Sequence, residues 1–430
     1  MDSTLALIVL GAAGLVVLLT QVPIECTLFL YGLSLGFPDI LPLGTMSQAI
    51  NVRLDDFLVG VLLLHVVTNG STTAWTRSQR AIAMSMALFA SICVVSLALT
   101  LWSDLKPELY FVYRFVGTAV MFFTLLRSVE SPRAMKWLGT GMLIAGLALV
   151  VQILPRIASF SPTSSTYYEY KHAASFKTWN PNTFGQIATV LSYLAGLRAF
   201  GVTRAASSPR WVMTGVAAFF AISPAMVFSR TATVSLFASW CLFFLVSRRW
   251  KQALCMCVIA VTALLWFASS ERQYVAEATS IDVTTGAGFS GRFDLWAVAR
   301  GLLEAHPILG NGFGLETRLF AEKFGGGMSH NAVLSILVEL GAVGLLGMVA
   351  VLIAYWAGLR RLMNCAGRRD GPALLMCLLV AECIQSCFGS ALYWEKPCIM
   401  GIALIGVYLG IFEREEIRCS HVADIRIERY

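Results

Sequence analysis

The chain has 430 residues, of which 57% are hydrophobic and 13% charged, with a formal net charge of +7 at pH 7. Soluble domains carry roughly 25% charged residues, whereas the mean hydropathy here is +0.72. This composition excludes a nucleic-acid-binding protein, a disordered chain and a disulfide-stapled secreted module. The apolar residues gather in runs of about 20, the length that crosses a bilayer as a helix. We therefore expect an all-α polytopic membrane protein.

Thirteen apolar runs follow one another along the chain. The first, Thr4 to Val22, lacks a basic n-region and a small-residue cleavage site, which predicts a retained span rather than a cleaved signal. The second contains Pro38 and Pro42, so it can be broken or re-entrant. The runs cover residues 4–22, 26–45, 55–68, 79–101, 109–126, 134–155, 182–201, 211–228, 231–247, 250–268, 330–356, 371–393 and 396–412.

Basic residues in the short connections predict the orientation. They alternate along the chain as one side of a membrane should, and short loops rich in Lys and Arg stay in the cytoplasm. The sequence therefore predicts about twelve spans with both ends inside, which requires one of the first three runs not to cross. The tail 413–430 falls on the same side. These connections hold Arg77 and Arg80; Arg127, Arg133 and Lys136; Arg198, Arg204 and Arg210; Arg248, Arg249 and Lys251; and Arg360, Arg361, Arg368 and Arg369.

Two substantial polar segments fall on the other side of a single membrane domain, residues 1–430. The first outer loop covers 156–181, and the longer one covers 269–329. The longer loop contains FDLWAVARGLLEAHPILG, whose apolar spacing is helical rather than strand-like. We expect short helices in this loop and a site at the outer membrane–water boundary.

His330 stands where the long loop re-enters the membrane, after three glycines. We expect the following helix to begin near Ser329, a suitable N-cap residue. The positive end of a helix dipole disfavours imidazolium, and a neutral imidazole can take a proton from an attacking hydroxyl. The alternative is a boundary histidine that bonds water or a carbonyl group.

Three arginines are expected at the outer boundary: Arg114, Arg230 and Arg292. Guanidinium groups offer planar, bidentate donors that match phosphate oxygens, so together they would suit a lipid-linked pyrophosphate. Alternatively, each extends to lipid headgroups or pairs with a local acid. Lys171 in the first outer loop is a further substrate-binding candidate, although a lysine in such a loop is more often solvated.

Two other features have simpler interpretations. GNGFG at 310–314 lacks the preceding strand and the following Lys-Ser/Thr of a nucleotide loop, which indicates a turn. Glu339 lies nine residues after His330 and would face away from it on a straight helix. We interpret Glu339 as an inter-helix hydrogen-bonding group. No ligand cluster calls for a metal or another cofactor.

GRFDLWAVARGLLEAHPILGNGFG, followed by SHNAVLSILVELGAVGLLG, resembles the signature of the O-antigen ligase and polymerase superfamily. SRTA around Arg230 resembles the family's turn, and NPNTFGQIATVLSYLAGL at 180–197 resembles its segment at the outer end of a span. The resemblance covers residues 180–350. The signature elements, in order, are Arg292, Trp296, Pro307, Gly310, Gly312, Gly314, His330, Asn331, Glu339, Gly341 and Gly344.

This resemblance implies an inverting, metal-independent glycosyltransferase with a GT-C-like fold in the bacterial inner membrane. Its donor would be an undecaprenyl-pyrophosphate-linked glycan, used on the periplasmic face without a nucleotide sugar. His330 matches the family's general base, and Arg230 and Arg292 match the arginines that hold the leaving pyrophosphate. Arg114 and Asn182 match more loosely and, with Asn331 and Lys171, are candidate substrate contacts.

The acceptor stays open at this stage. A ligase would attach a polymer to lipid A–core, whereas a polymerase would join lipid-linked repeat units; exopolysaccharide-type members fit about as well. Transfer to protein is less favoured, since the chain ends soon after its last run. A polysaccharide or lipid transporter would place polar groups near the midplane at broken helices. Here the informative charges gather at one face instead.

Overall fold

The computed structural model describes most of the apolar runs and part of the long loop. The described residues are 20–34, 41–43, 50–52, 54–69, 73–101, 109–158, 181–200, 209–227, 229–252, 254, 257–258, 292–324, 329–365, 370–388 and 396–427. The first run up to residue 19, most of 250–268 and most of the first outer loop lie outside them.

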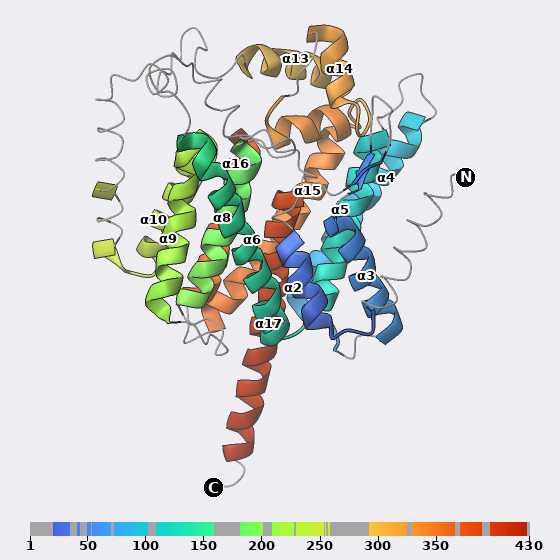
Figure 1. Cartoon of the computed structure of the whole chain (residues 1–430). Helices are drawn as coiled ribbons and strands as arrows, with labels where there is room; N and C mark the ends of the chain where they lie inside the picture. Colours follow the sequence, from blue (N-terminus) through green and yellow to red (C-terminus); the bar gives the residue numbers. More distant parts are fainter. Residues whose placement is uncertain are drawn as a thin grey trace, which may run out of the picture.

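The fold is a bundle of helices with one short β-hairpin (Figure 1). Long apolar helices dominate because a backbone in lipid must satisfy its hydrogen bonds within the segment. The helices are α2 (Ile24–Ser34), α3 (Leu54–Asn69), α4 (Arg77–Leu101), α5 (Leu109–Ser128), α6 (Pro132–Ala158), α8 (Pro181–Ala199), α9 (Arg210–Met226), α10 (Arg230–Val246), α13 (Arg292–Ala305), α14 (Glu316–Phe324), α15 (Ala332–Cys365), α16 (Asp370–Phe388) and α17 (Lys396–Ile427).

Within the described ranges, six helices are long and apolar enough to cross a membrane, and shorter apolar helices lie beside them. The prediction of a polytopic, helical membrane protein is therefore confirmed. The six candidate spans are Arg77–Thr100, Phe111–Ser128, Pro132–Pro155, Ala332–Asn364, Asp370–Cys387 and Pro397–Arg418; the shorter helices are Ile24–Ser34, Arg210–Met226 and Arg230–Val246.

The structure confirms the interruption expected in the second run and departs from one predicted boundary. The run 26–45 is broken: α2 ends at Ser34, and strand β1 (Leu41–Leu43) pairs antiparallel with β2 (Ile50–Val52). At 1.5 Å per residue, the 11 residues of α2 rise about 16 Å, well short of a hydrocarbon core of about 30 Å. The run 396–412 is longer than expected, because α17 continues to Ile427 through most of the predicted tail.

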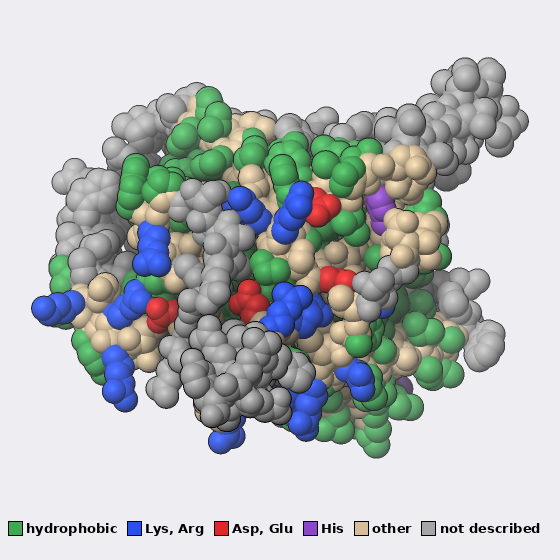
Figure 2. Space-filling view, turned by 90° about the horizontal axis from the view of Figure 1, so that it is seen from below, with side chains coloured by type: hydrophobic (Ala, Val, Ile, Leu, Met, Phe, Trp, Pro, Cys, Tyr) green, Lys and Arg blue, Asp and Glu red, His purple; other side chains and the backbone are tan. Residues whose placement is uncertain are grey.

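One end of the bundle carries ion pairs between helix ends, and we call it the basic end. Arg249 bonds Asp370 at 2.6 Å, which joins the end of α10 to the start of α16. Arg361 on α15 bonds Glu413 on α17 at 3.1 Å. Lys and Arg side chains gather across this face (Figure 2). Arg249 and Arg361, two of the predicted basic residues, therefore lie at one end of the folded bundle; Arg204, Arg368 and Arg369 lie outside the described residues.

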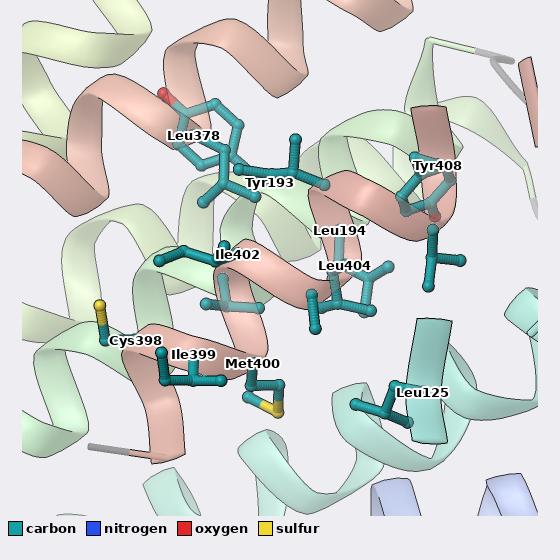
Figure 3. Close-up of a cluster of buried hydrophobic side chains, with 14 of the residues drawn as sticks. Leu125, Tyr193, Leu194, Leu378, Cys398, Ile399, Met400, Ile402, Leu404 and Tyr408 are labelled. Carbon is teal, nitrogen blue, oxygen red and sulfur yellow. The ribbon is translucent and has the colours of Figure 1, made fainter. Parts of the chain in front are cut away.

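The opposite end carries α13 and α14 (Figure 1), and we call it the α13–α14 end. Between the two ends, α8, α16 and α17 pack through buried side chains that include Tyr193, Leu378 and Leu404 (Figure 3). α2 and α6 approach closely at Gly32 and Gly141, where an added Cβ would meet the other helix's backbone at 2.4 Å and 2.2 Å. Small residues allow such close helix crossings in membranes.

Candidate functional site

Helices α13 and α14 confirm the short helices predicted in the long loop. They pack on the first turns of α15 through their own small apolar core, separate from the main one. This packing fixes both loop helices against the helix that follows His330. The buried members of the core are Leu295, Ala299, Leu302, Leu315, Leu319, Phe320 and Val338.

α15 is broken, contrary to the straight helix assumed in placing Glu339. Gly341 has φ 61° and ψ −157°, inside an otherwise continuous helix. In an unbroken helix, the carbonyls of Val338 and Glu339 would accept hydrogen bonds from the N–H groups of Ala342 and Val343. The break takes these four backbone groups out of helical register. In an apolar region, they need other partners.

The turn after α13 supplies those partners. Its backbone pairs with both sides of the break, and the Asn311 side chain adds a bond from Nδ2 to the carbonyl of Val338 at 2.9 Å. The loop is therefore joined to the transmembrane helix by backbone bonding. The four replacement bonds are Asn311 N to Val338 O at 2.8 Å, Gly312 N to Glu339 O at 2.9 Å, Ala342 N to Pro307 O at 2.9 Å, and Val343 N to Ile308 O at 3.2 Å.

The glycines of GNGFG make this junction possible and confirm that the segment is a turn. Gly310, Gly312 and Gly314 all have positive φ. A Cβ on Gly310 would lie 2.4 Å from the carbonyl carbon and oxygen of Glu339. Phe313 then packs edge-on against Phe111 and Phe115 of α5, with ring centroids 5.0 Å and 4.9 Å away.

Glu339 is the inter-helix hydrogen-bonding group that the sequence predicted. Its side chain is 1% exposed, and its Oε1 accepts a bond from the backbone N–H of Glu316 at 3.1 Å. Because Glu316 is the first residue of α14, this carboxylate also lies at the positive end of that helix. Glu339 therefore fixes α14 to α15.

His330 lies just before α15 in a left-handed conformation, with φ 52°. The expected cap at Ser329 is displaced by two residues. The Oδ1 of Asn331 accepts bonds from the N–H groups of Val333 at 2.9 Å and Leu334 at 3.2 Å, which is the N-cap arrangement. Asn331 is the N-cap residue because its side-chain oxygen reaches two amide groups in the first turn of α15 that have no partner within the helix.

Asn182 and Arg230 lie at neighbouring helix starts. The Ser229 hydroxyl, which precedes Arg230 and α10, donates to Asn182 Oδ1 on α8 at 3.4 Å. A Cβ on Gly185 would lie 2.7 Å from that same hydroxyl, so α8 and α10 touch here. The other end of α10 is the basic end, where Arg249 bonds Asp370. Arg230 is therefore at the opposite end of the bundle, as predicted.

The remaining candidates are less closely connected. Arg114 lies on α5, one residue before Phe115, whose ring packs against Phe313. Arg292 is the first residue of α13. Lys171 lies outside the described residues. Across the described ranges, no three His, Cys, Asp or Glu side chains gather as a metal site would require.

Two residues contact the approach to His330 although the sequence motifs assign them no role there: Trp296 and Glu316. Trp296 Nε1 donates to the carbonyl of Ser329 at 2.9 Å, and Glu316 Oε1 accepts from the N–H of Ser329 at 2.9 Å. An acid in the first turn of a helix is common, so no sequence signal marks this contact.

The structure thus defines a polytopic membrane protein in which the starts of α8 and α10, the residues before α15 and the loop helices lie at the α13–α14 end. The sequence model of the Wzy_C family, described as O-antigen ligase, matches residues 215–349. The resemblance expected from the motifs is confirmed over this segment, which contains Arg230, Arg292, His330 and Asn331. The match indicates a membrane glycosyltransferase of the O-antigen ligase or polymerase type in polysaccharide biosynthesis. A search among curated proteins gives no match.

Proposed function

We propose that the chain transfers a glycan from undecaprenyl pyrophosphate to an acceptor hydroxyl, at the α13–α14 end. The observation that carries this proposal is the shared location of Arg230 and His330 at helix starts of that end, within the family segment. In this reaction, the bond between the sugar carbon and the pyrophosphate oxygen breaks, and the acceptor oxygen bonds to that carbon with inversion.

The proposed division of roles follows from the charges. The leaving pyrophosphate gains negative charge, which guanidinium groups of Arg230 and Arg292 and the positive helix starts would stabilise. His330 would take the proton from the acceptor hydroxyl. Arg114 and Asn182 would contact the donor, with Lys171 as a further contact. Asn331 caps α15 through its Oδ1 and remains a predicted substrate contact.

The basic end supports the orientation. If that end is cytoplasmic, as positively charged short loops favour, the α13–α14 end faces the periplasm of a bacterial inner membrane. We retain about twelve spans and a GT-C-like arrangement as part of this proposal. Membrane lipids would surround the bundle, and lipid A–core or a growing glycan would supply the acceptor.

The broken helix α15 argues against the transporter alternative. Transporters expose unwound backbone at broken helices to their substrates. Here the four backbone groups at Gly341 are paired with the turn after α13. A polymerase remains the alternative enzyme, because it would use the same donor chemistry with a different acceptor.

The test is the lipid-linked glycan pool of a deletion strain complemented with wild type, His330→Ala or Arg230→Lys. Long glycan stranded on the lipid carrier would indicate a ligase, and single repeat units without long chains a polymerase. We expect both variants to fail, Arg230→Lys because it loses bidentate geometry. Arg300→Lys, on the exposed face of α13, and His306→Ala, at the exposed residue that follows α13, are the matched controls. Normal glycan in the His330→Ala strain would remove His330 from the mechanism.

A further inference from the structure

Both backbone groups of Ser329, the residue before His330, are held by side chains from two different helices. Trp296 of α13 bonds its carbonyl, and Glu316 of α14 accepts its N–H, each at 2.9 Å. Ser329 is 0% exposed, so water does not compete for these groups. The backbone that enters His330 is therefore clamped between α13 and α14.

The residues on the other side of His330 are also held. Asn331 caps α15, and its backbone N–H donates to the Ser329 hydroxyl at 3.4 Å. The same hydroxyl lies 3.0 Å from that of Ser335, one turn into α15. His330 thus sits between two anchored residues with φ 52°. A residue with a Cβ rarely adopts this left-handed backbone conformation. The conformation persists where neighbouring contacts impose it.

Glu316 is suited to impose the φ of His330 because Glu316 is itself held in place. Its backbone N–H donates to Glu339 Oε1, and its side chain is 1% exposed. Burial raises the pKa of the Glu316 carboxyl, while hydrogen bonds from Ser329 and Ser335 lower it. A chain of contacts therefore runs from the break in α15, through Glu339 and Glu316, to the residue before His330.

We propose that Glu316 is a positioning residue for His330, acting through the bond that its Oε1 accepts from the Ser329 N–H. This inference rests on the proposed function, in which His330 acts as the base. Without the acceptor, the Ser329 N–H loses its partner, and His330 relaxes toward the more favourable negative φ. The imidazole then leaves the position that meets the acceptor hydroxyl. Because a misplaced base slows the chemical step, the loss falls on kcat.

The test uses the full-length protein in lipid nanodiscs, with the undecaprenyl-pyrophosphate-linked glycan and acceptor extracted from the producing strain. We expect Glu316→Ala to lower kcat at least 10-fold, with KM for the donor within 2-fold of wild type. Glu316→Gln keeps an acceptor oxygen, so it should restore kcat to within about 3-fold and leave the pH profile of kcat/KM unchanged. Glu322→Ala is the matched control: it lies on the same helix but is exposed, paired with Arg318.

Trp296→Phe provides an independent variant should Glu316→Ala fail to fold. It keeps an aromatic ring but removes the donor to the Ser329 carbonyl, so kcat should again fall with KM unchanged. Wild-type kcat in folded Glu316→Ala, or a Glu316→Gln enzyme as slow as Glu316→Ala, would overturn the inference. His330→Ala distinguishes failure of the positioning role from failure of the proposed function. If it is inactive while Glu316→Ala and Trp296→Phe have wild-type kcat, only the positioning role fails; if it is fully active, the proposed function fails.

Discussion

Gly341→Ala tests whether the junction between the glycine turn and the broken helix holds this end of the protein together. With the break kept, the new Cβ would lie 2.4 Å from the carbonyl carbon and oxygen of Ile308 and 2.6 Å from the N of Gly310. Those neighbours are backbone atoms, which cannot rotate away. The φ of 61° with ψ of −157° is also a region that is essentially restricted to glycine.

Straightening of α15, which displaces the turn, costs less free energy than keeping the break with this clash. Straightening restores two helical bonds but forfeits the four backbone bonds between helix and turn and the Asn311 side-chain bond to Val338. The net loss is three hydrogen bonds, worth about 1.5–4.5 kcal/mol. Phe313 also leaves its two ring contacts on α5, worth about 0.5–1.5 kcal/mol each. We therefore expect Gly341→Ala to destabilise the protein by about 2.5–7.5 kcal/mol.

The assay combines thermal unfolding in nanodiscs, glycan transfer and hydrogen exchange of the peptide that contains Asn311 and Gly312. We expect a lower melting temperature, lost transfer and faster exchange at those two amides. Gly301→Ala is the control, because a Cβ on Gly301 of α13 meets nothing within 4 Å. Wild-type melting with both amides still protected in Gly341→Ala would refute the reasoning, since it would show that the break does not need glycine.

Three further substitutions test separate contacts. Asn331→Ala removes the α15 cap and should cost about 1 kcal/mol, measured by thermal unfolding, whereas Asn331→Asp should retain the stability. Glu316→Gln should raise the melting temperature increasingly as pH rises. Burial raises the pKa of the Glu316 carboxyl in the folded state, so the wild type loses stability as pH rises from the ordinary pKa of 4.5 to the raised folded pKa, where only the unfolded state has lost the proton. The difference from Glu316→Gln should therefore vanish below 4.5 and level off above the folded pKa. Glu413→Ala removes the acceptor of Ser78 N (3.1 Å), the Ser78 hydroxyl and Arg361. It should destabilise by about 2–4 kcal/mol, seen as a lower melting temperature and reduced membrane yield; an unchanged protein would show that water replaces the carboxylate.

The order of the described helices, and the bounds of several of them, could be predicted from the apolar runs. α10 begins at Arg230 and α13 begins at Arg292, close to the expected positions. The separation of basic connections from the candidate site followed from alternation along the chain. The turn at 310–314 followed from its glycines. These features depend on residues close together in the sequence, whose periodicity and backbone preferences act locally.

The contacts that shape the candidate site could not be predicted in this way. The clamp on Ser329 joins it to Trp296, 33 residues away, and the bond from Glu316 to Glu339 spans 23 residues. The break at Gly341 needs a turn whose backbone can pair with the broken helix. The sequence pattern does not predict which turn lies close enough to do so. Burial determines these hydrogen bonds, because an amide or carboxyl group removed from water must pair with a group that the packed helices bring within reach.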